Sequence, residues 1–158
     1  FDIYASASMD TDRDQNSFIL LKKGKYSEVS EVTPDVIAEF SKQPDAKVPV
    51  VNGDLLVLLA TDASDGAKYV LASFHGDTNG LATIPVVKAV VSYATAQQPG
   101  RKILFGMDAN TYTKPEEDQQ GVVEFAKFYI LLKKCRPPMI HRRAPRQVKS
   151  KKISNEFF

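Results

Sequence analysis

The chain has 158 residues and a formal net charge of +2; 43% of its residues are hydrophobic and 25% charged, which excludes disorder throughout and allows one domain with an adequate core. Residues 1–132 hold 12 Lys and Arg against 18 Asp and Glu, a net of −6, whereas residues 133–158 hold 9 against 1, a net of +8, so we expect an acidic body and a basic tail. The lone Cys135 excludes an internal disulfide and fits a reducing compartment inside the cell, and no apolar run approaches the roughly 20 residues that span a bilayer.

The N-terminal part begins with a polar stretch and a strand. Residues 10–14 carry four charges but lack the glycine and the distal glutamate of a calcium-binding loop, so we interpret them as a solvated loop. Residues 18–21, Phe-Ile-Leu-Leu, predict a strand, and the Lys-Lys-Gly-Lys sequence at 22–25 predicts the turn after it. The apolar positions of residues 26–32 predict a second short strand, which we expect to pair with the first.

A helix and a hairpin are predicted next. Residues 33–35, Thr-Pro-Asp, supply an N-cap, a first-turn proline and a first-turn acid, which together predict a helix through residue 40. Residues 55–60 and 68–74 are nearly continuous apolar runs joined by a loop rich in Asp and Ser. This pattern predicts an antiparallel hairpin of two central strands, both faces of which are covered.

The next segments alternate helix and strand. Apolar residues recur at helical spacing between 81 and 98, which predicts a helix, although the many valines leave a strand over part of this segment open. Residues 102–105 predict another strand. Pro115 and the acids at 116–118 suit a helix N-terminus, so we expect a last helix from Pro115 through Tyr129.

Polar side chains follow two of the predicted strands. His75 follows the strand that ends at residue 74, and Asp108 and Asn110 follow the strand that ends at residue 105. Because a helix joins the two strands, we expect both ends at one edge of a sheet, and on an extended segment Asp108 and Asn110 would point the same way. The set suits phosphodiester hydrolysis, since a carboxylate holds a hard cation while imidazole and carboxamide groups contact anionic oxygens. Turns capped by Asn and Asp at strand ends explain the same residues without any function.

A family resemblance favours the first interpretation. Residues 74–78, Phe-His-x-x-Thr, followed by residues 105–110, Phe-Gly-Met-Asp-Ala-Asn, resemble the endonuclease/exonuclease/phosphatase superfamily, which includes deoxyribonuclease I-like enzymes. The likeness covers roughly residues 13–130. It implies an α/β fold, a four-layered sandwich of two mixed β-sheets flanked by helices. It also implies a hydrolase, a phosphodiesterase or nuclease that requires Mg²⁺ or Mn²⁺.

The resemblance also implies roles for individual residues. Asp108 and Asn110 would position the attacking water and bind the phosphate, and Asp108 would contact the metal ion. His75 would orient or protonate the scissile group. Thr78 and Asn16 would contact the substrate, a phosphodiester in nucleic acid, a phosphorylated small molecule or a lipid headgroup.

The sequence departs from the family pattern in three places. Met107 stands where the family usually has glycine. The metal-binding glutamate of the family would precede Phe1, and its Ser-Asp-His element would follow the last helix, where His141 has no aspartate beside it. We therefore expect a truncated domain over residues 1–132, with an uncovered sheet edge and with activity reduced by several orders of magnitude.

The basic tail is expected to differ from the body in structure as well as in charge. Residues 133–152 hold nine cations and three prolines but few apolar residues, so we predict that residues 133–158 are extended or disordered. The tail could bind nucleic acid, another polyanion or a partner protein, or it could be merely solvated.

Three functions therefore remain open. The chain could be a phosphodiesterase or nuclease, or a non-catalytic relative that acts as a binding or assembly subunit through its tail. It could also be an unrelated α/β domain whose Asp-x-Asn strand end is a coincidence. The last hypothesis would separate His75 from Asn110 by well over about 10 Å, beyond the reach of hydrogen bonds through one water.

Overall fold

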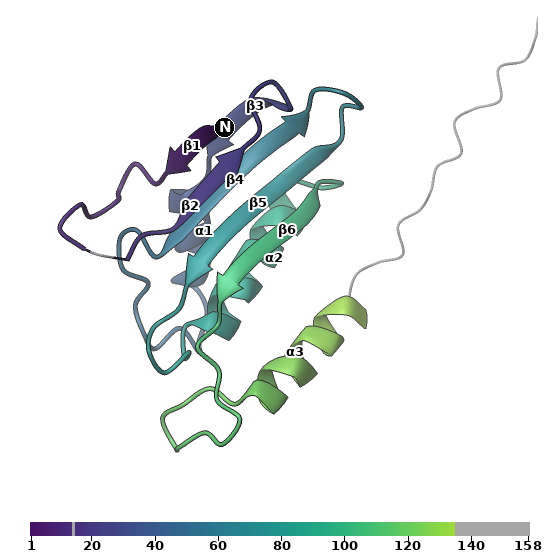
Figure 1. Ribbon diagram of the computed structural model, residues 1–158. Helices are drawn as coiled ribbons and strands as arrows, with labels where there is room; N and C mark the ends of the chain where they lie inside the picture. The colour runs from purple at the N-terminus through teal and green to yellow at the C-terminus, as the bar shows by residue number, and fades with distance from the viewer. Residues whose placement is uncertain (14, 135–158) are drawn as a thin grey trace, which may run out of the picture.

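The computed structural model describes residues 1–13 and 15–134, which form two sheets and three helices (Figure 1). In chain order the elements are β1 (Asp2–Ala5), β2 (Phe18–Leu21), β3 (Tyr26–Glu31), α1 (Thr33–Phe40), β4 (Leu55–Asp62), β5 (Lys68–His75), α2 (Thr83–Gln97), β6 (Lys102–Asp108) and α3 (Val122–Lys134). The α/β class is as predicted. The basic tail from residue 135 on lies outside the described residues. Among the helices described, none is both long and apolar enough to cross a membrane.

The larger sheet contains four strands in the order β3-β4-β5-β6. The predicted hairpin is confirmed, because β4 and β5 pair antiparallel from Leu55↔Phe74 to Thr61↔Lys68 and occupy the centre of the sheet. β6 pairs parallel to β5, and α2 makes the crossover that such a connection requires. The helical interpretation of this crossover segment is confirmed over the strand alternative.

The two faces of this sheet are covered differently. On one face α1 and α2 enclose the main core, which includes Val36, Val57 and Val90. On the other face the antiparallel pair β1–β2 covers a smaller cluster of buried residues, Leu21, Leu56, Leu58, Ala60 and Leu71. The described residues thus form three layers, and the fourth layer of the expected sandwich is not among them. The two-stranded sheet of β1 and β2, called the small sheet below, does not cover this face fully. A groove of about 390 Å³, lined largely by apolar side chains, remains beside β5 and β6.

Two expectations about the N-terminal part were wrong. β1 was not predicted, yet Asp2–Ala5 pairs with β2. β3 pairs with β4 instead of β2, with Tyr26 opposite Asp62. The side chains of Tyr26 and Val29 pack against the smaller core cluster, so this run is apolar because it covers that cluster.

A glutamate of β3 connects the two sheets. Glu31 accepts hydrogen bonds from Ser6 Oγ at 2.7 Å and from Ala7 N at 2.9 Å, just beyond β1. Partial burial raises the pKa of Glu31, but these hydrogen bonds outweigh burial and leave the pKa below its ordinary value. The charged carboxylate therefore helps to hold the small sheet in place.

Two predicted helix starts also differ from the structure. Thr33 is not the N-cap of α1, because its hydroxyl oxygen accepts a hydrogen bond from Val57 N at 3.0 Å and Val32 takes the cap position. α3 begins at Val122, not at Pro115. The acids expected in its first turn lie in a turn before it, where Glu116 N donates to Gln119 Oε1 at 3.0 Å.

One ion pair at the far end of the sheet leads to a prediction about pH. Lys25 Nζ lies 2.7 Å from Asp62 Oδ2, and Ser64 donates to Asp62 Oδ1 from both its hydroxyl and its amide. The hydrogen bond from Lys25, followed by those from Ser64, holds the pKa of Asp62 well below its ordinary range. Asp62 therefore stabilises the fold fully above about pH 4, near the ordinary pKa of Asp, and this contribution falls as the pH drops toward the folded-state pKa.

We predict that Asp62→Asn lowers the free energy of unfolding at pH 7 and that its deficit relative to the unaltered chain shrinks at pH 3. Urea unfolding at the two pH values measures both quantities. Asp65→Asn is the control, because it removes the same charge from the same loop and leaves the Lys25 pair in place. A deficit of equal size at both pH values would contradict the prediction.

Candidate functional site

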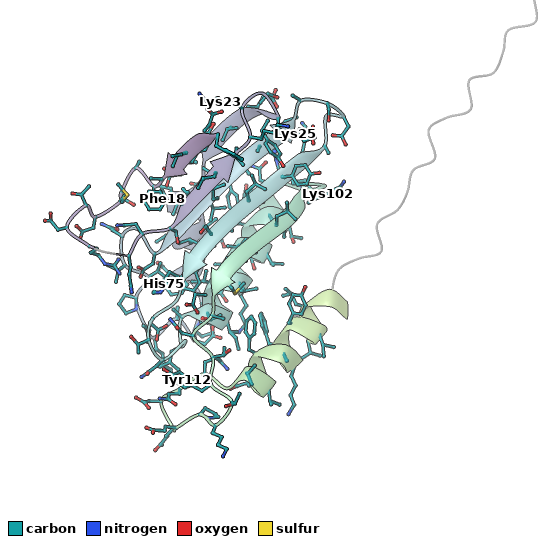
Figure 2. The ribbon with its side chains drawn as sticks, in the orientation of Figure 1. Phe18, Lys23, Lys25, His75, Lys102 and Tyr112 are labelled. Atoms are coloured by element: carbon teal, nitrogen blue, oxygen red, sulfur yellow. The ribbon has the colours of Figure 1, made fainter. Side chains whose placement is uncertain are left out.

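The candidate site lies where β5 and β6 end. His75 and Asp108 are Cα partners in the parallel pairing of these strands, which confirms that the two strand ends share one edge of the sheet. Paired residues on adjacent strands project to the same face, and the strands lie about 4.8 Å apart. Asp108 is exposed and His75 is half-buried. An imidazole and a carboxylate therefore lie side by side at this edge (Figure 2 labels His75).

Hydrogen bonds extend this pairing past the strand ends. Gly76 N donates to Asp108 O at 3.0 Å, and Asn110 Nδ2 donates to Gly76 O at 2.9 Å. Asn110 is thus bonded to the residue that directly follows His75, which is the proximity that a shared phosphate site requires. The large separation between His75 and Asn110 that an unrelated domain would show is not observed.

The expectation that Asp108 and Asn110 project from an extended segment was wrong. Asn110 has a φ of 44°, in the left-handed region that asparagine tolerates better than most residues. The chain turns here, and Asn110 N donates to Asp108 Oδ1 at 3.1 Å. The turn, and not strand alternation, brings the backbone of Asn110 to the Asp108 carboxylate.

Several acceptor groups at the edge remain accessible to a ligand. Among the described residues, no protein group donates to Asp108 Oδ2 or to Asn110 Oδ1, and none bonds to the His75 imidazole. These atoms can accept from water, hold a cation or, in the case of the imidazole, donate to an anionic oxygen. The chemistry of the site depends on them.

The loop between β5 and α2 is held from within. The Asp77 carboxylate accepts from Leu81 N at 3.2 Å and from Ala82 N at 2.8 Å, just before α2 begins. The fully buried Thr83 donates its hydroxyl to Ala109 O at 2.9 Å. Both turns of the site are therefore fastened to the start of α2.

Thr78 lies on the same loop, three residues after His75. Its side chain is exposed, and its carbonyl accepts from Tyr112 Oη at 2.8 Å. A second link joins Asn79 Nδ2 to Asp118 Oδ2 at 3.1 Å. Sequence reasoning missed Tyr112 and Asp118, for which the only signal was their position soon after the Asp-x-Asn strand end (Figure 2 labels Tyr112).

Asn16 is held within its own loop. Its amide donates to Asp10 O at 3.0 Å and to Arg13 O at 3.2 Å, and its Oδ1 is buried without a hydrogen-bond partner. A Cβ on Gly53 would lie 1.9 Å from this oxygen, so the side chain is packed against the backbone there. Asn16 therefore supports the 10–16 loop. Gly53 precedes Asp54, whose carbonyl accepts a hydrogen bond from His75 N at 2.9 Å. A contact between Asn16 and the substrate stays a prediction.

Neighbouring carboxylates limit how a metal ion could bind. Asp77 is engaged at the start of α2, and Asp54 forms an ion pair with Arg13 at 2.8 Å and accepts from Val51 N. Within residues 1–13 and 15–134, no group of three or more His, Cys, Asp or Glu side chains could hold a metal ion. Mg²⁺ often binds one or two carboxylates together with water and substrate phosphate, and Asp108 Oδ2 fits one such ligand.

Comparisons with known proteins add no relative. A scan against protein-family models, a search of curated proteins and a search of solved structures each found no match. The family resemblance therefore rests on the motif residues alone.

Gly80 leads to a prediction about the stability of the site. Its φ is +70°, and a Cβ there would lie 2.4 Å from Asn110 O and 2.7 Å from Ala109 O. Gly80→Ala should therefore displace the turn that carries Asn110, in addition to the strain of a left-handed alanine. We expect a loss of at least about 3 kcal/mol in the free energy of unfolding, measured with urea.

Gly66→Ala is the matched control for this substitution. Gly66 has a φ of +69°, and a Cβ there meets nothing within 4 Å. This change isolates the cost of the backbone conformation, about 1–2 kcal/mol. Equal losses for the two variants would show that Gly80 does not hold the turn of Asn110.

Proposed function

We propose that this chain binds a phosphodiester at the ends of β5 and β6 and hydrolyses it with a divalent metal ion. The observation that supports the proposal most directly is the pairing of His75 with Asp108, extended by the hydrogen bond from Asn110 to Gly76 O. It gathers an imidazole, a free carboxylate oxygen and a free carboxamide oxygen at an exposed edge. These groups suit a tetrahedral anion surrounded by water.

Each side chain has a distinct role in this proposal. Asp108 Oδ2 contributes one ligand to Mg²⁺ or Mn²⁺, which supplies positive charge to the phosphoryl oxygens when it is bound. Asn110 Oδ1 accepts from the attacking water and orients it. A ring N–H of His75 donates to a phosphoryl oxygen or to the leaving group. The exposed Thr78 hydroxyl is a further donor to the substrate.

The expected rate of phosphodiester hydrolysis is low. His75 is the only histidine among the described residues, and Asp108 is the carboxylate that pairs with it at the strand ends. One imidazole and one carboxylate provide weaker general-base catalysis than a site with a second histidine–aspartate pair. The proposed substrate class is a phosphodiester in nucleic acid, a small phosphorylated molecule or a lipid headgroup.

Cleavage assays test this proposal. The full chain is incubated with bis(p-nitrophenyl) phosphate or a labelled oligonucleotide in Mg²⁺, Mn²⁺ or a chelator. We expect slow cleavage that requires the metal ion and falls at least about 100-fold in Asp108→Ala and in His75→Ala. Asp65→Ala, a loop substitution at the opposite end of the sheet, should cleave at the unaltered rate. Cleavage that survives Asp108→Ala, or no cleavage under any of these conditions, would overturn the proposal.

A second candidate is a non-catalytic binding or assembly subunit, and the charge of the tail favours it. Nine cations in residues 133–152 would make polyanion binding steeply dependent on salt. Deleting residues 133–152 should abolish salt-sensitive oligonucleotide binding and reduce the slope of log K against log salt by up to about 6. Deleting residues 153–158, which contain no Lys or Arg, is the control. Fluorescence anisotropy over a salt series measures the binding constant and its salt dependence for each deletion. If deleting residues 133–152 leaves the slope of log K against log salt unchanged, the tail is excluded as the binding segment.

A further inference from the structure

The outer edge of β6 is unpaired among the described strands. The sheet order β3-β4-β5-β6 places β6 at the end, and none of the described strands pairs with its outer side (Figure 1). Leu104, in the middle of this strand, is 53% exposed. The unpaired amide and carbonyl groups of an edge strand are a template for pairing with another chain, particularly where the strand is apolar.

The sequence of β6 is complementary to itself in antiparallel orientation. If two copies pair around a two-fold axis at Phe105, Lys102 lies opposite Asp108 of the partner subunit, and the same ion pair recurs at the other end. Leu104 then lies opposite Gly106, so the larger side chain meets open space, and Ile103 lies opposite Met107. Directly opposed Cβ atoms in such a pair lie about 5 Å apart, within reach of Lys and Asp.

We propose that this protein forms a homodimer through antiparallel pairing of β6 with β6, and that Lys102 of one subunit contacts Asp108 of the partner subunit. The two-fold axis is perpendicular to the sheet and continues it from four strands into eight. The symmetry makes both halves of the interface identical, as in most homodimers.

The alternation of exposed and core-facing residues along β6 selects this register. Lys102, Leu104, Gly106 and Asp108 are the exposed positions, whereas Ile103, Phe105 and Met107 pack against the main core. A perpendicular two-fold axis pairs only residues of the same face, so the register can shift only in steps of two residues. A shift of one step places Lys102 opposite Gly106 or Leu104 opposite Asp108, and both ion pairs are lost.

The helix layer offers more surface for the same partner. α3 packs toward α2, where Lys88 Nζ lies 5.9 Å from the Phe128 ring, and exposes Val123 (62%), Ile130 (53%) and Leu131 (60%). Because the axis is perpendicular to the sheet, the helices of both subunits lie on the same side of the joined sheet. Apolar surface on α3 can then be covered together with the strand edge, which alone is smaller than a standard interface.

The dimer would also change the candidate site. The ammonium group of Lys102 would stand beside Asp108 of the partner subunit and could donate to a phosphate oxygen bound there. This consequence rests on the proposed function, whereas the dimer itself does not. Each site would then be built from two subunits.

Charge exchange tests the interface. Sedimentation velocity of the full chain over a concentration series should show a dimer, which Lys102→Asp and Asp108→Lys each weaken by about tenfold or more, since two attractions become repulsions. The double variant with both changes should restore it. Lys114→Asp, an exposed position off the interface, should leave it unchanged. A monomer at all concentrations, or a double variant no better than the single ones, overturns the proposal.

Cross-linking tests the register. Within one subunit Lys102 and Asp108 lie six positions apart on a strand, about 20 Å, and Figure 2 labels Lys102 and His75 at opposite ends of the sheet. A carbodiimide, which joins an amine directly to a carboxylate, can therefore link Lys102 to Asp108 only between subunits. Mass spectrometry should find this linked peptide in the dimer-sized product; a cross-linked dimer without it overturns the register. Neither experiment involves cleavage, so failure of the proposed function would leave their outcome unaffected.

Discussion

Parallel pairing between β5 and β6 is the constraint on which the candidate site depends. It places His75 opposite Asp108, and the hydrogen bonds of Gly76 and Asn110 continue the pairing beyond the strands. Side chains alternate along a strand, so a slip of one residue would turn Asp108 to the helix-covered face. The core residues Ile103 and Phe105 resist that slip, because it would expose them. Apolar packing at one face thus fixes the position of polar groups at the other.

The polar residues near this edge divide into those that hold the backbone and those that remain available. Asp77, Asp54 and Asn16 bond to main-chain groups or to Arg13, and their removal would loosen loops. Asp108 and Asn110 each use one atom for the turn and leave one oxygen free. A side chain that both shapes the turn and faces solvent can bind a ligand with little reorganisation, because its position is already set.

The parts of the fold that were predicted correctly from the sequence are mostly those with a local sequence pattern. The β4–β5 hairpin, α2 and β6 follow from apolar runs, turn residues and helical spacing, and the meeting of His75 with Asp108 follows from the crossover. The partners of β1 and β3 were missed because pairing between distant segments has no local signal. The start of α3 was misplaced since the acids after Pro115 suit a turn as well as a helix. Asn16 packs against Gly53, and Asn110 bonds to Gly76 O in its left-handed turn. No sequence pattern encodes either of these contacts between distant segments.

The crossover connection also sets an order for folding. β4 and β5 are joined by a short turn, so their contacts are local and form at small entropic cost. Within one subunit, β6 reaches β5 only after residues 76–101 have been ordered, and none of the described strands lies on its other side. The strand that carries Asp108 therefore docks late and is the first candidate to detach in the native state. The ligand-binding edge then exists only while the last-docked strand remains in place.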